Sequence, residues 1–450
     1  MTVKEAFAAG KFYTADKNEL LKTLKDFQNN HKADYNVKSR AIIVPHAGYQ
    51  YSGQLALDGF SYLDTNVKNI FIFAPTHRKS VNNLALSPAD EFETPLGKLP
   101  VNKEIVEELI KDFNCEYSED AFGEEHAIEV QLPFIQFFLK DVNIVPILIG
   151  NDDVDKTIKI IEKYYPDKEN AFVISSDLSH YMKEDDAIKV DNVTAAMIEN
   201  SHLQGFRFEQ ACGAIPMVAL SEFARKNTFS LIRVGMTNSG QTTGDHDRVV
   251  GYGSWFLYEG TRNDFIEKYF SPKLISIARK TIESKLEGKT EINITSYFPY
   301  PPVLDSTGAV FVTLEIAGRL RGCIGSPIAH TSLIIDLIKN AHNAAFSDPR
   351  FRPITREEYD KTDISISILS SPEKMSFKDE KDLLNQMREN IDGIIIRDGE
   401  NQALYLPSVW KQLPDKKMFL NTLKQKAGME PNHFSDTFEA YRFTANYIKE

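Results

Sequence analysis

Short apolar segments alternate with longer amphipathic segments through the first 258 residues of the chain. Several of the apolar segments are almost continuous runs of β-branched or aromatic residues, which are typical of strands buried on both faces. This alternation predicts an α/β domain in which a parallel or mixed sheet carries helices on both faces. The predicted strands are 40–44, 69–74, 143–148, 171–175, 230–234 and 249–258, and the predicted helices are 54–63, 103–113, 125–139, 155–164, 185–199 and 212–226.

The pattern changes after residue 258. A polar stretch, 259–270, leads into a second half in which apolar residues recur at every second position, as in 308–317 and 363–369. Such alternation indicates strands with one face in water, so this half is predicted to be a smaller α+β domain. We therefore place the domains at 1–260 and 268–450. The other elements predicted in the second half are helices over 272–286 and 416–426 and strands over 393–397, 403–406 and 438–443.

Charge and composition exclude several classes of protein. The 450 residues have a net charge of −12, so a nucleic-acid-binding protein is not predicted. No apolar run approaches the ~18 residues of a membrane-spanning helix, and the N-terminus lacks the apolar core of a signal peptide. The three cysteines lie far apart, which argues against a disulfide framework and for a reducing compartment. We expect a cytoplasmic protein without a membrane partner.

Polar side chains follow the ends of three predicted strands. His46 follows the first strand, His77 follows the second, and Asp177 and His180 follow a third. Ligands of open α/β sheets bind beyond the carboxyl ends of the strands, so these side chains could line one pocket. Cys212 begins a predicted helix, where the helix dipole would favour a thiolate.

Imidazole, thiolate and carboxylate groups are the usual ligands of zinc, copper and iron. None of the candidates follows a short metal-binding signature such as HExxH or CxxC, so their spacing alone does not separate a metal site from hydrogen-bonding histidines. A site with three protein ligands and an open position would be catalytic, whereas a closed site with four ligands would be structural.

The remaining histidines of the first half and Cys115 are predicted to have different roles. His126 lies among acidic residues at the start of a predicted helix, and we favour an acid/base or supporting role over a simple helix-start charge cluster. His246 lies in a loop rich in Gly and Thr, and we favour no chemical role for it. His31 and His202 are predicted at the surface, and Cys115 is predicted to be structural or incidental.

In the second half, residues 320–326 read LRGCIGS. One interpretation is a structural turn that contains a small buried Cys323. The other is a reactive Cys323 thiol activated by Arg319 and Arg321. Folding would have to bring a base such as His330 or His342 near the thiol.

The first half resembles the Memo family. The resemblance rests on VPHAGYQYSG, PTH, EEHAIEVQLPF, SSDLSHY and CGAIPM, which occur in the family's order over roughly residues 1–260. It implies a fold related to extradiol ring-cleaving dioxygenases, a transition metal (copper, iron or zinc) held by His46, His77 and Cys212, and a pocket also lined by Asp177 and His180. Cys212 stands where those dioxygenases have a carboxylate ligand, which argues against ring cleavage.

The second half resembles the AMMECR-one family, through LRGCIG, SDPRF, DISISIL and YLPSVW over roughly residues 272–448. The two halves also resemble components B and A of the prokaryotic AmmeMemoRadiSam set. This resemblance implies a separate radical S-adenosylmethionine (radical SAM) protein as a partner. The chain itself has no CxxxCxxC motif for that partner's iron–sulfur cluster.

Three functional hypotheses follow. The first is a metal-dependent enzyme that acts on a small molecule or modified substrate, in which Asp177, His180 or His126 moves protons, with Cys323 as a further catalytic candidate. The second is a non-catalytic scaffold that binds a small-molecule or peptide ligand. The third is a hydrolase or transferase in which Cys212 is the nucleophile and His46, His77 or His180 is the base.

Overall fold

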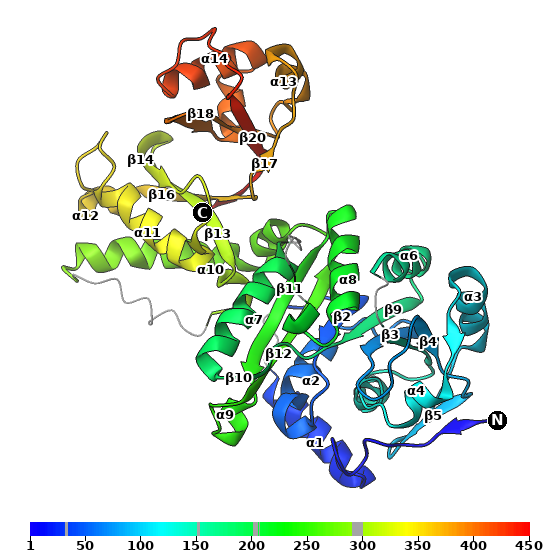
Figure 1. The fold of residues 1–450 in the computed structure, drawn as a ribbon. Coiled ribbons are helices and arrows are strands. Elements are labelled where there is room, and N and C mark those ends of the chain that lie inside the picture. Colours follow the sequence, from blue (N-terminus) through cyan, green and yellow to red (C-terminus); the bar gives the residue numbers. More distant parts are fainter. Residues whose placement is uncertain (32–34, 151–153, 201–205, 207, 290–299) are drawn as a thin grey trace. The chain divides into compact units, whose positions relative to one another are not determined.

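The computed structural model describes the whole chain except residues 32–34, 151–153, 201–205, 207 and 290–299. The chain divides into two compact units, Met1–Arg262 and Asn263–Glu450, called here the N-terminal and C-terminal domains. Each domain is described by itself (Figure 1). Among the described helices, not one combines the length and the apolarity that a membrane crossing requires.

The N-terminal domain is built on a nine-stranded mixed sheet. Its centre consists of four parallel strands in the order β2 (Ala41–Val44), β9 (Asn170–Ser175), β3 (Asn69–Pro75) and β8 (Asn143–Ile149). The strands β12 (Val249–Tyr258) and β4 (Leu84–Leu86) extend it antiparallel, beside β2 and β8 respectively. The sheet is completed by β10 (His180–Met182), β11 (Ser230–Asn238) and β7 (Glu116–Tyr117).

Helices in two groups pack around this sheet. One group is α1 (Lys17–Asn30), α2 (Gln54–Phe60) and α5 (Leu132–Phe138). The other is α3 (Lys103–Phe113), α6 (Val154–Tyr164), α7 (Glu184–Glu199) and α8 (Ala214–Lys226). A smaller sheet joins β1 (Val3–Lys4), β5 (Glu91–Thr94) and β6 (Gly97–Pro100), and two short helices are α4 (Glu119–Gly123) and α9 (Gly240–Thr243). The predicted mixed α/β architecture is confirmed, because the central strands are buried throughout or nearly so, as their sequences indicated.

Two helix starts differ from the prediction, and both lie at the candidate site. The helix predicted over 125–139 is shorter: α5 begins at Leu132, after a single 3₁₀ turn over Glu129–Gln131. The Glu125 carboxylate accepts the main-chain N–H groups of His126 and Ala127, which holds this segment out of a helix. The helix predicted from Cys212 begins at Ala214.

The C-terminal domain contains two antiparallel sheets. The first has the order β14 (Arg319–Gly325), β13 (Thr307–Ile316), β16 (Thr362–Leu369) and β21 (Ala445–Lys449), with the short β15 (Thr331–Ser332) beside β13. The second has the order β17 (Glu373–Lys374), β20 (Glu439–Phe443), β18 (Gly393–Asp398) and β19 (Asn401–Tyr405). The helices are α10 (Arg262–Leu286), α11 (Leu333–Phe346), α12 (Arg356–Tyr359), α13 (Glu380–Gln386) and α14 (Lys416–Lys426). The predicted α+β class is confirmed.

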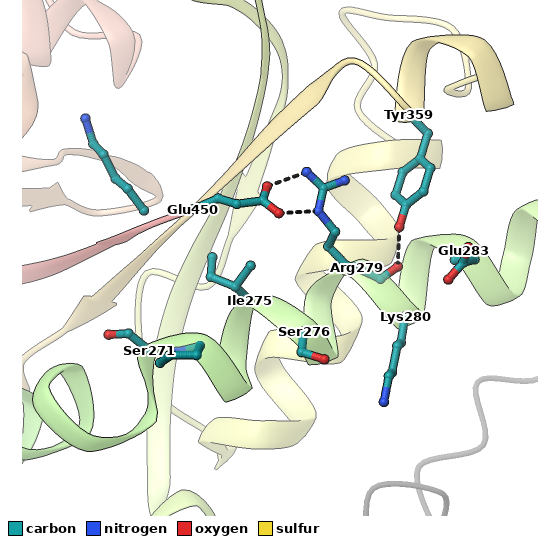
Figure 2. A pocket seen from close by; sticks show the side chains of 10 residues that line it. Ser271, Ile275, Ser276, Arg279, Lys280, Glu283, Tyr359 and Glu450 are labelled. Atoms are coloured by element: carbon teal, nitrogen blue, oxygen red, sulfur yellow. Dashed lines mark hydrogen bonds and ion pairs between the residues drawn. The ribbon is translucent and has the colours of Figure 1, made fainter.

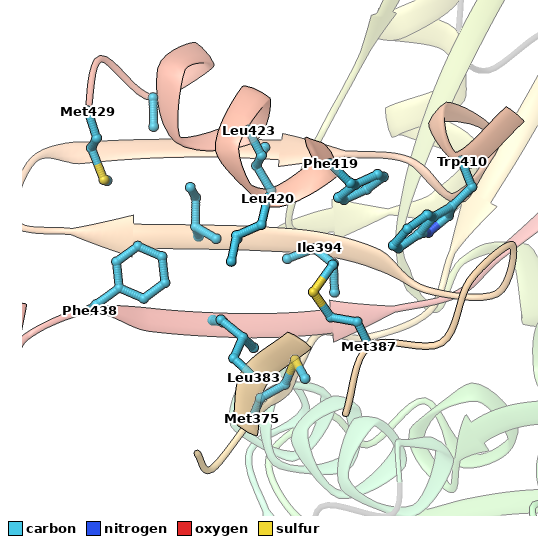
Figure 3. Close-up of a cluster of buried hydrophobic side chains, with 13 residues drawn as sticks. Met375, Leu383, Met387, Ile394, Trp410, Phe419, Leu420, Leu423, Met429 and Phe438 are labelled. Carbon is cyan, nitrogen blue, oxygen red and sulfur yellow. The ribbon is translucent and has the colours of Figure 1, made fainter. Parts of the chain in front are cut away.

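Side chains of α13, α14 and the second sheet form a buried apolar cluster (Figure 3). At one end of this cluster the rings of Trp410 and Phe419 stack with centroids 4.0 Å apart. The Trp410 indole N–H donates to the carbonyl of Asp392 at 2.7 Å, so its polar atom is also satisfied inside the core.

The helix α10 begins ten residues before the predicted start at Pro272 and continues through that proline. The first turns of α10 bury Phe265, Ile266 and Phe270, and this burial outweighs the hydrogen bond that a proline cannot make. Further along, Arg279 pairs with Glu450 and ties α10 to the last strand, at the edge of a groove of about 560 Å³ (Figure 2).

Candidate functional site

His46 lies two residues beyond the end of β2 and is 1% exposed. Its Nδ1 lies 2.9 Å from the hydroxyl oxygen of Ser175, the last residue of the neighbouring strand β9. Its main-chain N–H donates to Asp177 Oδ1 at 2.8 Å. Two adjacent parallel strands therefore fix this imidazole and leave its Nε2 directed elsewhere.

His77 lies two residues beyond β3, the next strand but one. Its Nδ1 lies 3.0 Å from Glu125 Oε1, and its main-chain N–H donates to Glu125 Oε2. Burial alone would raise the pKa of Glu125, but hydrogen bonds from His77 and from the main chain hold that pKa at about 2. The Glu125 carboxylate is therefore ionised and orients His77 with Nε2 free, as carboxylates orient metal-binding histidines.

His126 completes a cluster of three imidazoles. The ring centroids of His46, His77 and His126 lie between 4.8 and 5.5 Å from one another. One ring nitrogen from each lies within 4.8 Å of the others, a spacing that could hold a metal ion. This spacing brings a predicted acid/base residue, His126, into the set of potential metal ligands.

The cluster has the electronic character of a metal site. Burial, together with the neighbouring imidazoles, lowers the pKa of His46 and lowers that of His126 to about 3. Both rings are therefore neutral at physiological pH, which is the form that binds a metal. The Nδ1 of His126 is buried, and although it lies 3.3 Å from Glu125 Oε1, it has no hydrogen-bond partner. An unsatisfied buried nitrogen in such a cluster fits a missing ligand.

Cys212 contacts the cluster through His46. Its Sγ lies 3.2 Å from His46 Nε2 and accepts the main-chain N–H of Asp177, also at 3.2 Å. Cys212 lies before α8 rather than within it, and burial together with Asp177 raises the pKa of its thiol. The expectation that the helix dipole favours a thiolate here is therefore wrong, because burial outweighs the dipole.

Asp177 and His180 lie beside the same cluster. Burial raises the pKa of Asp177 to about 6, against the opposing effect of the main-chain N–H of His46 and of His180. His180 is half-buried at the start of β10 and interacts electrostatically with both His46 and Asp177. The sequence thus correctly indicated that these strand ends meet.

The N-terminal segment Phe7–Tyr13 also reaches the cluster, which the sequence did not reveal. The ring of Phe12 stacks on His126 with centroids 4.2 Å apart. The buried carboxylate of Glu129 anchors this segment: it accepts the main-chain N–H groups of Phe7 and Ala8 and the hydroxyl of Tyr13, each at 2.7 Å. The only signal in the sequence was the acidic character of the stretch that contains Glu129.

The other described histidines of the N-terminal domain have partners elsewhere. His246 is exposed and pairs with Glu184, and His31 pairs with Asp58. His202 lies outside the described residues. Cys115 is buried, with 3% of its surface exposed.

Cys323 of the C-terminal domain lies in the edge strand β14, partly exposed. The Thr313 hydroxyl donates to its Sγ at 3.2 Å. The Arg350 guanidinium donates to the Cys323 carbonyl at 3.0 Å and also interacts with the thiol. The two arginines predicted to activate the thiol make no hydrogen bond to it among the described interactions: Arg319 is exposed, and Arg321 pairs with Glu358.

The bases proposed for Cys323 are not in place either. His330 is exposed, and the Nδ1 of His342 lies 3.4 Å from the side-chain oxygen of its neighbour Asn343. Neither imidazole hydrogen-bonds to Cys323 among the interactions of the described residues.

The fold and the site together define an α/β protein with a partly buried three-histidine cluster at the carboxyl edge of its sheet, joined to a smaller α+β domain. Comparison with known families agrees: the model of the Memo-like proteins matches residues 4–256, and the AMMECR1 model matches residues 275–448. The chain belongs to the Memo-like family, as a fusion of a Memo-like domain with an AMMECR1 domain.

Several relatives match the first half over nearly their whole length. MEMO1 family proteins from Thermoplasma volcanium and Aquifex aeolicus are 30% and 32% identical, and the matches cover 56% of this chain and 97% and 98% of theirs. A MEMO1 family protein from Methanobrevibacter smithii is 34% identical, with 56% of this chain and 98% of its own covered. Among solved structures, without assignment to either half of this chain, the crystal structure of an uncharacterized protein from Pyrococcus horikoshii matches with 32% sequence identity; the match covers 39% of this chain and 88% of that chain, with a TM-score of 0.37.

Proposed function

We propose that the N-terminal domain is a metal-dependent enzyme that acts on a small organic molecule. The observation that carries the proposal is the group of three imidazoles, from His46, His77 and His126, with nitrogens within 4.8 Å of one another. Neutral imidazoles suit copper, iron and zinc, and three protein ligands leave positions open for a substrate. We assign the third ligand to His126 in preference to the predicted Cys212, because ring nitrogens of His46, His77 and His126 all lie within 4.8 Å of one another.

The residues around the cluster support a catalytic role. When bound, a metal ion here would supply a Lewis acid that polarises a substrate oxygen. Glu125 and Ser175 hold His77 and His46 through their Nδ1 atoms, so that both rings keep a fixed orientation. Asp177, with a pKa of about 6, is suited to take up and release a proton near neutral pH.

A second candidate function rests on the contact between Cys212 and His46. The Sγ–Nε2 distance of 3.2 Å, with His46 Nδ1 next to Ser175, is the arrangement of a nucleophile and its general base. In such a hydrolase or transferase, the thiol proton would pass to His46 as the sulfur attacks. The same Nε2 cannot serve a metal and the thiol at once, so the two candidates compete for one atom.

A proposed partner of this chain rests on resemblance alone. The fusion of a Memo-like with an AMMECR1 domain suggests a separate radical SAM protein as partner, because both components resemble parts of one prokaryotic set. The alternative is a non-catalytic role, in which the N-terminal domain binds a peptide or small ligand. Binding of a ligand that the protein does not convert into a product would support this role.

Metal binding by single variants tests the first candidate. We expect purified wild-type protein to bind a transition metal and His77→Ala to bind it at least tenfold more weakly, whereas the control His246→Ala, which also removes a glutamate-paired histidine, is unchanged. Unchanged metal binding in both His77→Ala and His126→Ala would refute the assignment.

The variant Cys212→Ala tests whether His126 or Cys212 is the third metal ligand. If metal binding survives this substitution, His126 rather than Cys212 is the third ligand; if binding is lost, the thiol is the ligand after all. Alkylation of Cys212 that substrate blocks and a chelator does not would favour the hydrolase or transferase.

A further inference from the structure

The C-terminal domain brings together two segments that are distant in sequence, residues 320–326 and residues 347–351. Asp348 accepts the main-chain N–H of Cys323 at 2.8 Å, and Arg350 donates to the carbonyl of the same residue. Asp348 and Arg350 also pair with each other at 2.7 Å. Cys323 is therefore held by both of its main-chain polar groups while its side chain remains partly exposed.

Hydrogen-bond donors and positive charge surround the thiol. The Thr313 hydroxyl donates to Sγ, and Arg350 interacts with it from a side chain that is 53% exposed. The ammonium group of Lys426, which is held by the carbonyl of Leu404 at 3.0 Å, interacts electrostatically with both Cys323 and Arg350. These groups favour an anionic ligand beside the sulfur.

A second observation, independent of the thiol, also indicates an anionic ligand. The side chain of Arg321 is 10% exposed, and its Nη1 is buried without a hydrogen-bond partner. Its guanidinium and that of Arg350 both lie within 6 Å of the Phe351 ring, at 5.7 and 5.6 Å. The buried Nη1 of Arg321 has no acceptor and belongs to a guanidinium that shares the Phe351 ring with Arg350, and a carboxylate or phosphate would satisfy such a donor.

The local charge contrasts with that of the whole chain, which is −12. Among the described charged groups that interact around Cys323 and Phe351, cations outnumber carboxylates. This excess of positive charge favours the binding of small anions. The carboxylates are Asp348 and Glu358, and the cations are Arg321, Arg350, Arg352 and Lys426.

From this arrangement we propose that the C-terminal domain carries a second reactive site, in which the Cys323 thiol attacks small anionic electrophiles that Arg350 and Lys426 bind. In the reaction a bond forms between Sγ and an electrophilic carbon, and the bond from that carbon to its leaving group breaks. The leaving group departs with the electron pair, and the thiol proton is released to solvent. Electrophiles with a carboxylate or phosphate group are the substrate class.

Two alkylating probes that differ in charge test the proposal on the full chain. Iodoacetate is anionic and iodoacetamide is neutral, and peptide mass spectrometry reports the alkylation rate of each cysteine. For Cys323 we expect the ratio of the iodoacetate rate to the iodoacetamide rate to be roughly fivefold higher in the folded chain than in urea. Buried Cys115 serves as an internal comparator that should stay unreactive while the chain is folded.

Substitutions in α14 test whether Lys426 causes the preference of Cys323 for the anionic probe. Lys426→Gln keeps a donor for Leu404 but removes the charge, so the rate ratio should fall toward its value in urea. Lys426→Arg should retain the ratio, and the exposed Lys417→Gln, the same change in the same helix, should leave it unaltered. The proposal is overturned if folded Cys323 is unreactive, if its rate ratio does not change on folding, or if Lys426→Gln behaves like Lys417→Gln.

Discussion

The anchoring of the N-terminal segment by Glu129 leads to a quantitative prediction. The substitution Glu129→Gln keeps the shape of the side chain but removes its charge and turns one acceptor oxygen into a donor. Three donors depend on this carboxylate, namely the main-chain N–H groups of Phe7 and Ala8 and the hydroxyl of Tyr13. The change therefore weakens or opposes all three hydrogen bonds and leaves the rest of the domain as it is.

The size of the effect follows from the difference between charged and neutral hydrogen bonds. A hydrogen bond to a charged group contributes about 1 kcal/mol more than a neutral one. Over three bonds the free energy that holds the segment closed should fall by about 3 kcal/mol, which raises the fraction of opened segment by roughly 100-fold.

Hydrogen–deuterium exchange is the appropriate assay because it reports local opening without requiring the whole chain to unfold. We expect the amides of Phe7 and Ala8 to exchange roughly 100-fold faster in Glu129→Gln and to be unaffected in Glu124→Gln, a change at an exposed glutamate nearby. Equal exchange in the two variants would refute the reasoning, since it would mean that Glu129 does not hold the segment.

Three further predictions concern stability. Burial raises the pKa of Asp191 to about 6, above its value in an unfolded chain, so the contribution of this carboxyl to stability is greatest in acid and is lost as the pH rises through about 6. The stability of Asp191→Asn relative to wild type should therefore increase by about 2–3 kcal/mol between pH 4 and pH 7.5 in calorimetric scans. A stability difference that does not change with pH would contradict this. Phe419→Ala removes the ring that stacks on Trp410 and should destabilise the C-terminal domain by about 3–5 kcal/mol in urea unfolding followed by tryptophan fluorescence; a loss below about 1 kcal/mol would count against a tightly packed core. Gly322→Ala would place a Cβ 2.1 Å from the carbonyl oxygen of Ala344, so we expect a lower melting temperature and less soluble protein, whereas an unchanged melting temperature would show that β14 and α11 can separate freely.

The positions of His46, His77 and Asp177 could be predicted because parallel strands present their carboxyl ends at one edge. The role of His126 could not be predicted in full. Its ring position depends on an irregular segment held by Glu125 and on Phe12, which comes from the far N-terminus. Such contacts arise from tertiary packing and leave no periodic signal in the sequence.

The environments of the two cysteines were predicted less well than their positions. The helix-dipole argument for Cys212 took no account of burial, which the sequence does not report for a residue in a turn. For Cys323 the predicted cations were its neighbours in sequence. A register shift in the pairing of β13 with β14 leaves Arg321 as an extra residue, and the cation at the thiol is Arg350 from another segment.

The contacts of Cys323 with Asp348 and Arg350 have a consequence for how chains of this protein meet one another. The strand β14 is at the end of its sheet, where main-chain groups are normally open to pairing with another molecule. Here a carboxylate and a guanidinium occupy the N–H and the C=O of Cys323, so two side chains act as a one-residue substitute for a neighbouring strand. The side-chain pair that holds Cys323 thus also prevents this residue from pairing with the strand of another molecule. Loss of the pair would expose these main-chain groups to edge-to-edge pairing and would also disturb the surroundings of the thiol.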